Sequence, residues 1–266
     1  MIVCKSPAEL ERMRAANQLV ADVLVALRGQ TAPGVTTAAL DAFAERWVRD
    51  AGAVPAFKGY HGFPATLCIS VNEEVIHGIP GPRALVPGDI VSIDLGVVLD
   101  GFYGDAAITV PVGEIADEAE TLLRVTEESL YLGIEQARIG GRVTDIGQAV
   151  QRHVEAHGFS VVREFVGHGV GRALHEEPQV PNYGPGGRGP RLTEGMTLAI
   201  EPMVAMGKAA VKVLGDGWTA VTKDRSLAAH FEHTIAVTAA GPVILTTPGR
   251  ASRDAGAGGR GQSSGG

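Results

Sequence analysis

Cysteine is scarce in this sequence, and the features of several protein classes are missing. Only Cys4 and Cys68 occur among 266 residues. Two cysteines cannot form a disulfide framework, so we expect both to be free thiols in a reducing cytoplasm. No apolar run approaches the roughly 20 residues needed to span a bilayer, and the first residues lack the character of a targeting peptide. We therefore expect a cytoplasmic protein without membrane segments.

An excess of positive charge is also absent. The formal net charge is -7, which argues against nucleic-acid binding through a strongly basic surface. The sequence contains neither the Gly-x-Ser-x-Gly elbow of serine hydrolases nor a phosphate-binding Gly-x-x-x-x-Gly-Lys-Ser/Thr loop. The glycine-rich run 184–189 follows no predicted strand and opens no helix, so we interpret it as a surface loop. These absences leave a soluble protein with other chemistry.

The sequence contains enough hydrophobic residues to form a large core. The hydrophobic fraction is 45%, and a chain of this length buries most of such residues in one large domain or two small ones. We predict a single catalytic domain over residues 1–247. The run from Pro248 to Gly266 contains mainly Gly, Ser, Ala and Arg, so we predict a disordered tail there.

The predicted elements repeat in two halves, about 5–110 and 116–240. Each half begins with two helices and continues with strands. We expect helices over 7–28, 37–51, 116–138 and 144–157, and strands over 66–71, 90–98, 103–110, 159–163, 197–206, 210–214, 219–223 and 230–238. Three matched pairs lie 107 positions apart: His61 with His168, Gly88 with Gly195, and Asp94 with Glu201. A duplicated fold would place Asp94 opposite Glu201 across a pseudo-twofold axis.

Two aspartates lie on neighbouring predicted strands. Asp100-Gly101 is typical of a hairpin turn, and a hairpin centred there pairs Asp105 with Gly96. Since side chains alternate along a strand, Asp94 and Asp105 share a face as diagonal neighbours, roughly 7–8 Å apart at the backbone. The alternative is a pair of solvated strand residues, but Asp94 lies in an apolar run where an isolated carboxylate is costly. This favours metal ligands.

Three further residues complete a candidate ligand set. Glu201 and Glu232 are carboxylates in apolar strands, and His168 lies in Gly-His-Gly. Each alone has an ordinary explanation: a strand-edge carboxylate, a salt bridge to Lys212 or Arg225, or a loop histidine bonded to backbone. Four carboxylates and an imidazole, however, are the inventory of a two-metal hydrolytic site. The joint metal-ligand candidates are Asp94, Asp105, His168, Glu201 and Glu232.

Two more histidines stand near glycine-rich or acidic turns. His77 precedes Gly-Ile-Pro, and His175 precedes Glu-Glu-Pro. Neither has helical ligand spacing, so a proton shuttle or a donor to a developing oxyanion suits them better. Simple turn capping is the alternative. His77 and His175 are therefore candidate catalytic residues.

Eight short motifs are spread over the chain: Tyr60-His-Gly-Phe-Pro64, Cys68-Ile-Ser-Val-Asn72, His77-Gly-Ile-Pro80, Ser92-Ile-Asp-Leu-Gly96, Gly167-His-Gly-Val-Gly171, His175-Glu-Glu-Pro-Gln-Val180, Ile200-Glu-Pro202 and Phe231-Glu-His-Thr234. On these motifs the sequence resembles a known family, the type I methionine aminopeptidases. The resemblance covers roughly residues 5–245. It implies an α+β "pita-bread" fold, in which two pseudo-symmetric αβ halves surround a curved antiparallel sheet.

The resemblance also implies roles for the candidate residues. Asp94 would chelate one of two divalent ions (Co, Mn, Fe, Zn or Ni), Asp105 and Glu232 would bridge both, and His168 and Glu201 would complete the other. Glu201 would carry a proton, His175 would polarise the scissile carbonyl, and His77 would contact the amide after it. A methionine pocket would be lined by Tyr60, Phe63, Cys68 and Trp218. This chain departs from the family's usual pattern at Phe57, Phe63 and Leu174.

The implied activity is removal of the initiator methionine from nascent polypeptides whose second residue is small. The implied enzyme is a monomer that contacts ribosomes transiently, without binding a specific nucleic-acid sequence. Arg250, Arg253 and Arg260 in the tail are weak candidates for that contact. Two alternatives stay open: a non-catalytic binding module of the same fold, and a proline-directed peptidase.

Overall fold

The computed structural model describes residues 1–249 of the chain. Its helices are α1 (Pro7–Gln30), α2 (Thr37–Asp50), α3 (Asp117–Glu135) and α4 (Val143–Ala156), with a short 3-10 turn at Tyr60–Gly62. The strands are β1 (Val54–Pro55), β2 (Leu67–Val71), β3 (Glu74–Ile76), β4 (Ile90–Leu99), β5 (Phe102–Pro111), β6 (Ser160–Val161), β7 (Gly167–Gly169), β8 (Glu176–Val180), β9 (Thr197–Ile200), β10 (Met203–Ala205), β11 (Val211–Val213), β12 (Ala220–Thr222), β13 (Ala228–His230), β14 (Glu232–Thr238) and β15 (Gly241–Ile244).

The first helix begins where its sequence predicts. The Ser6 hydroxyl accepts a hydrogen bond from the Glu9 backbone N–H, and the Glu9 carboxylate accepts one from the Ser6 N–H, which completes a capping box. The apolar stripe of α1 packs on β4 and β5. A Cβ on Gly104 would lie 2.7 Å from the Ala16 backbone, so glycine at that position of β5 lets the helix approach the sheet closely.

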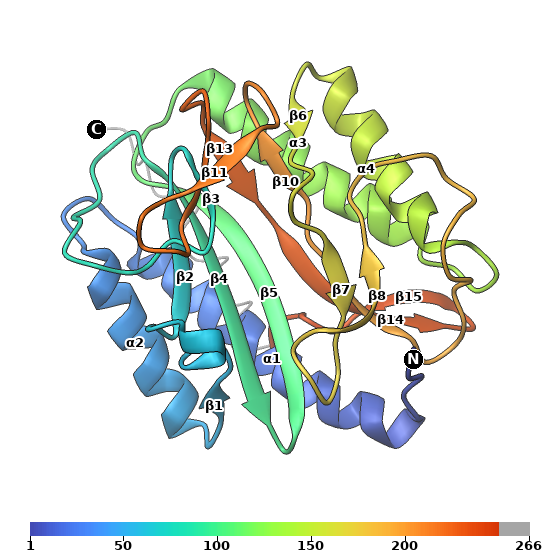
Figure 1. Cartoon of the computed structure of the whole chain (residues 1–266). Helices are drawn as coiled ribbons and strands as arrows, with labels where there is room; N and C mark the ends of the chain where they lie inside the picture. The colour runs from blue at the N-terminus through green and yellow to red at the C-terminus, as the bar shows by residue number, and fades with distance from the viewer. Residues whose placement is uncertain (250–266) are drawn as a thin grey trace, which may run out of the picture.

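A curved sheet occupies the middle of the molecule, and the helices lie behind it in Figure 1, α1 and α2 behind its first half and α3 and α4 behind its second. Its main strand order is β1-β4-β5-β14-β9-β7-β8, with β2 paired to β4 and β15 to β14. All its pairings are antiparallel. The predicted α+β fold is confirmed: two αβ halves meet at the seam between β5 and β14.

The repeat is visible in the positions of the elements. Helix α4 starts 106 residues after α2, and β9 starts 107 residues after β4. Each half has its own helix pair and its own buried core, one beneath α1 and α2 and one beneath α3 and α4. The matched strands therefore approach the seam from opposite sides, as the duplication predicts.

Two predicted strands are broken, which corrects the sequence analysis. The run 197–206 divides at Glu201-Pro202 into β9 and β10, and the run 230–238 divides at Phe231 into β13 and β14. Strands β9 and β14 pair in the large sheet, whereas β10 and β13 pair in a separate three-stranded sheet with β6. Pro202 cannot donate a backbone hydrogen bond, so the strand changes sheets there.

Two remaining features concern the ends and the surface. Within residues 1–249, none of the helices combines the length and the apolar character needed to cross a bilayer. The tail predicted over 248–266 lies outside the described residues from Arg250 onward. Gly249 donates its N–H to Asp22 of α1 at 2.8 Å, so the last described residues lie against the first helix.

Candidate metal centre

The predicted hairpin forms with the predicted register. Gly96 pairs with Asp105, and Asp94 pairs with Ala107. Asp100 and Gly101 both have positive φ angles, 50° and 78°, as the turn requires. Asp94 and Asp105 therefore face the same side of the sheet.

The second half brings its carboxylates to the same face. Glu232 at the start of β14 pairs with Ala107, so Ala107 lies between Asp94 on one neighbouring strand and Glu232 on the other. Its small side chain leaves room between two carboxylates. Glu201 follows β9, where Asn182 donates its side-chain amide to the Glu201 carbonyl at 3.0 Å. His168 lies on β7, paired with Ala199.

These side chains converge at one point. Ligand atoms of Asp105, His168 and Glu232 all lie within 4.8 Å of one another. The His168 Nε2 atom is 3.5 Å from Glu201 Oε1 and 3.8 Å from Asp105 Oδ2. Within the described residues, buried oxygens of Asp94, Asp105 and Glu232 have no hydrogen-bond partner. Unpaired buried carboxylates are expensive, and a divalent cation would satisfy them all.

The His168 ring has the tautomer and the neutral state that a metal ligand requires. Its Nδ1 lies 2.9 Å from the carbonyl oxygen of Gly169. A carbonyl can only accept, so Nδ1 carries the proton and the neutral ring presents the lone pair of Nε2 to the carboxylates. Burial lowers the pKa of His168 to about 4, which keeps the ring neutral. A backbone partner behind the ring is typical of metal-binding histidines.

The four carboxyl groups of this cluster all have raised pKa values. Burial raises the pKa of Asp94 to about 8. Burial, followed by repulsion from neighbouring carboxylates, also raises the pKa values of Asp105, Glu201 and Glu232 well above their usual range. Without a cation, these carboxyl groups therefore stay protonated at pH values at which they would be ionised in water. The donor set of carboxylates and one imidazole fits a divalent metal.

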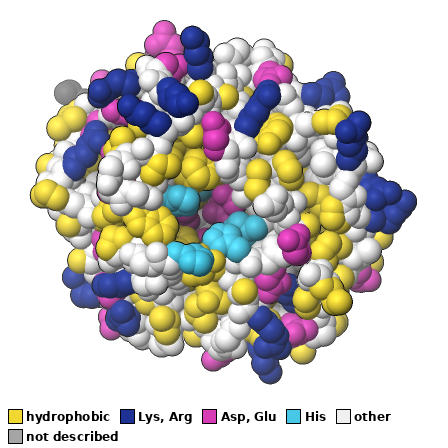
Figure 2. Space-filling view, viewed as in Figure 1, with side chains coloured by type: hydrophobic (Ala, Val, Ile, Leu, Met, Phe, Trp, Pro, Cys, Tyr) yellow, Lys and Arg dark blue, Asp and Glu magenta, His cyan; other side chains and the backbone are white. Residues whose placement is uncertain are grey.

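A cavity of about 410 Å³ adjoins this cluster. Figure 2 shows histidine side chains around a depression in this face, with acidic side chains inside it and hydrophobic ones alongside. Its apolar wall includes Phe57, Phe63, Cys68, Leu174 and Trp218. The rings of Phe63 and Trp218 meet edge to face at 5.1 Å. Because Cys68 pairs directly with Asp94, the wall and the carboxylates share one space.

Both remaining catalytic candidates line this cavity. His175 Nδ1 lies 2.8 Å from the Tyr60 hydroxyl, and the His175 ring is 4.3 Å from that of His168. His77 has a positive φ of 60°, which is uncommon for a bulky residue and is tolerated where surrounding structure fixes it. Burial lowers the pKa of His77 to about 4. The fold thus brings both histidines that the sequence predicted as catalytic candidates to the same cavity.

Some residues at the site were missed. Phe165 packs its ring on His77 at 5.7 Å and lines the cavity with His61, Ile76, Glu164 and Val166. Residues 164–166 lie two to four positions before the candidate ligand His168, and this nearness could have pointed to them. His230 lies two positions before Glu232 and carried a similar signal. It is buried, its Nε2 lies 4.0 Å from Glu201 Oε2, and that nitrogen has no hydrogen-bond partner.

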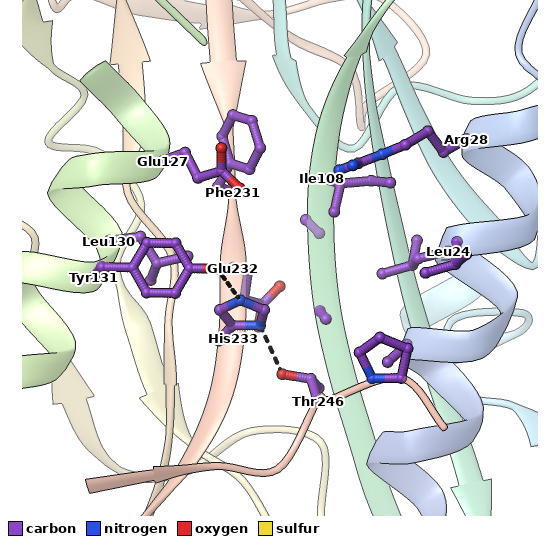
Figure 3. A pocket seen from close by; sticks show the side chains of 15 residues that line it. Leu24, Arg28, Ile108, Glu127, Leu130, Tyr131, Phe231, Glu232, His233 and Thr246 are labelled. Atoms are coloured by element: carbon purple, nitrogen blue, oxygen red, sulfur yellow. Dashed lines mark hydrogen bonds between the residues drawn. The ribbon is translucent and has the colours of Figure 1, made fainter. Parts of the chain in front are cut away.

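A second cavity, of about 230 Å³, lies on the opposite face of the sheet (Figure 3). It opens between α1 and α3, with Leu24 on one side and Tyr131 on the other. His233 follows Glu232, so its ring projects to this other face. There it meets the Tyr131 hydroxyl at 3.3 Å and the Thr246 hydroxyl at 2.8 Å.

The fold and the carboxylate–imidazole cluster define a metal-dependent hydrolase of the pita-bread class. A model of metallopeptidase family M24 matches residues 11–239. The chain is 55% identical to methionine aminopeptidase 1 of Bacillus subtilis over 246 residues, 92% of this chain and 99% of that one. The chain therefore belongs to metallopeptidase family M24, and the resemblance drawn from its motifs is confirmed.

Solved structures agree with this placement. A methionine aminopeptidase from Rickettsia prowazekii superposes with a TM-score of 0.92 at 42% identity, covering 93% of this chain and all of that one. A prolidase from Pyrococcus horikoshii gives a TM-score of 0.77 at 23% identity, covering 94% of this chain and 65% of that one. The second likeness concerns the fold alone.

Proposed function

We propose that this protein is a methionine aminopeptidase that removes the initiator methionine from nascent chains whose second residue is small and uncharged. The observation that carries the proposal is the convergence of five ligand candidates beside a cavity with an aromatic wall. Relatives sharing about half of the sequence across almost their full length are named methionine aminopeptidases, which supports the same activity here.

We assign the ligand roles residue by residue. Asp94, Asp105, His168, Glu201 and Glu232 would hold two divalent ions. The unpaired oxygens of Asp94, Asp105 and Glu232 support this assignment. The ions would supply Lewis acidity, which activates water near neutral pH and anchors a free α-amino group. Co, Mn, Fe, Zn and Ni all suit such ligands.

The protein's own groups would then orient the peptide and move protons. With the Tyr60 hydroxyl donating to His175 Nδ1, the neutral ring has its proton on Nε2 and donates it toward the carbonyl oxygen of the scissile bond. His77, kept neutral by burial, would donate to the next amide. Glu201 would accept a proton from the attacking water and return it to the leaving amine.

Methionine would occupy the apolar wall of the cavity. Tyr60, Phe63, Cys68 and Trp218 line it, as do Phe57 and Leu174. A thioether suits such a surface because its sulfur makes favourable contacts with aromatic rings. Phe57 lies against Gly96, where an added Cβ would come within 2.5 Å of the ring. This close packing would limit the depth available to the substrate side chain.

The test is a peptide assay. We expect release of methionine from Met-Ala-Ser, and none from Met-Arg-Ser, with Mn, Fe or Co added to folded protein. Absence of cleavage of the first peptide with every metal would defeat the proposal. Near-zero bound metal after anaerobic preparation would then favour a non-catalytic module, and cleavage of a Gly-Pro substrate would favour a proline-directed peptidase.

We further propose that the enzyme works in the cytoplasm as a monomer and meets nascent chains during transient contact with the ribosome. The negative net charge argues against tight, sequence-specific nucleic-acid binding. Co-sedimentation with ribosomes at low and physiological salt, together with light scattering of the free protein, tests both statements.

A further inference from the structure

The side chain of Lys5 is buried ahead of the first helix. Only 3% of it is exposed, and its ammonium pairs with the carboxylate of Glu176. The Lys5 backbone N–H donates to the Gly195 carbonyl at 2.7 Å. In Figure 1 the N-terminus lies beside β8 and close to the turn that joins β7 to β8. The amino-terminal segment is therefore anchored to the second half of the molecule.

Glu176 is the residue after His175, and it organises the turn that carries that histidine. Its Oε1 accepts the backbone N–H groups of Arg172 at 2.7 Å and Ala173 at 3.2 Å. Its Oε2 accepts a hydrogen bond from the Lys5 ammonium group. One carboxylate thus closes the turn 171–176 and joins it to the amino-terminal segment.

Gly171, the last glycine of the Gly-His-Gly-Val-Gly string, makes this approach feasible. A Cβ at position 171 would lie 2.3 Å from Lys5 Cε and 2.6 Å from its Nζ. Any larger residue would push the lysine out of place. The same turn has a second link to the N-terminal region, since Arg172 pairs with Glu9 at 3.0 Å. The Arg172 guanidinium also lies over the ring of Phe102 on β5, 4.6 Å from its centre.

The other side of the turn faces the cavity. Leu174 is 2% exposed and packs in the apolar wall, and His175 meets Tyr60 and His168. A shift of the turn would therefore move both side chains together. An ion pair this well buried has few alternative arrangements, because either partner left alone would be an uncompensated charge.

We propose that Lys5 is a positioning residue for His175: its ion pair with Glu176 holds the turn 171–176 so that the imidazole faces the scissile carbonyl. The inference rests on the proposed function. A misplacement of about 1 Å can cost roughly 100-fold in rate, so the loss is expected mainly in kcat.

The experiment compares Lys5→Met with His175→Ala and with the double variant, using Met-Ala-Ser and Mn²⁺. We expect Lys5→Met to lower kcat by about 10- to 100-fold while KM and the Mn²⁺ affinity from calorimetry stay within about threefold. In the His175→Ala background, Lys5→Met should lower kcat no further, because the group through which it acts is gone. Lys58→Met, which removes a mostly exposed lysine paired with Glu45, serves as the control.

Each outcome decides the matter. An unchanged kcat in Lys5→Met, or an equal further loss in the His175→Ala background, overturns the inference. If Lys5→Met does not fold, Glu176→Gln decides, since it removes the charge but keeps an acceptor for the turn. The same loss in kcat supports the inference, and wild-type kcat refutes it. A wild-type protein that releases no methionine refutes the proposed function instead.

Discussion

The central sheet has a cavity on each face, and the two cavities differ in whether their buried polar atoms have hydrogen-bond partners. On the concave face, oxygens of Asp94, Asp105 and Glu232 are buried without partners. On the opposite face, His233 bonds to Tyr131 and Thr246 (Figure 3). Glu232 and His233 are consecutive residues, so a single strand supplies both faces.

The difference shows what marks a reactive site in this protein. Both cavities have apolar walls, so a hollow with hydrophobic sides is not the distinguishing feature. Buried carboxyl oxygens without hydrogen-bond partners are distinguishing, because the fold retains them at a cost that a cation or a substrate would offset.

The largest effect is expected from Glu232→Gln. Loss of this proposed ligand should lower methionine release by more than the roughly 100-fold cost of losing a group that merely supports a ligand, and should abolish high-affinity Mn²⁺ binding in calorimetry. The matched control is Glu127→Gln, the same change at the mouth of the other cavity. Activity of Glu232→Gln within tenfold of wild type would contradict its role as a ligand.

A second prediction concerns the metal-free protein. Burial raises the pKa of Asp94 to about 8, whereas its unfolded value is near 4. The folded state therefore keeps a proton that the unfolded state has lost, and stability falls as pH rises toward 8, by up to about 1.4 kcal/mol per pH unit for each such group. Urea unfolding in chelator between pH 7 and 8.5 measures this.

The window avoids the buried histidines. Burial lowers the pKa values of His168 and His230 to about 4 and about 3. These groups make stability rise with pH, but only up to their unfolded value of about 6.5. Above pH 7 the carboxyl groups set most of the slope, and the Cys68 thiol, whose pKa burial also raises, acts in the same direction. Asp94→Asn should make the slope less steep, and a stability that increases from pH 7 to 8.5 in the wild type would refute the assignment.

A third, smaller effect is expected in the apolar wall. Phe63→Ala removes the edge-to-face contact with Trp218 and part of the methionine pocket. We expect kcat/KM for Met-Ala-Ser to fall by about 10- to 200-fold with unchanged Mn²⁺ affinity. Tyr131→Ala removes an aromatic ring from the other cavity and should leave kcat/KM within about threefold. Equal losses in the two variants would erase the distinction between the cavities.

The smallest effect is expected from Thr246→Val. The change leaves His233 Nδ1 without its hydroxyl partner, at a cost of about 1–2 kcal/mol in the free energy of unfolding, measured by urea denaturation. Methionine release at saturating Mn²⁺ should match wild type. A loss of more than tenfold would mean that the second cavity also supports the reaction.

Local patterns predicted the hairpin and the helix starts well. The turn Asp100-Gly101 set the register that pairs Gly96 with Asp105, and the Ser6 box set the start of α1. Both depend on residues within a few positions of each other. Pro202 was a local signal for the break in the run 197–206, but the sheets that the two parts join could not be predicted in this way. They depend on the pairing of β9 with β14 and of β10 with β13, which lie farther along the chain.

The amino-acid sequence by itself determined the ligand chemistry, the duplicated order of elements and the shared face of Asp94 and Asp105, since these follow from residue type, spacing and the period of a strand. The repeat also predicted that Asp94 and Glu201 face each other, but only the tertiary structure decided that His168 and Glu232 meet that hairpin near the β5–β14 seam. It also decided that Lys5 reaches Glu176 across 171 positions, and that His230 lies beneath Glu201. Such contacts depend on how the two halves pack against each other, and packing between distant segments leaves no periodic trace in the sequence.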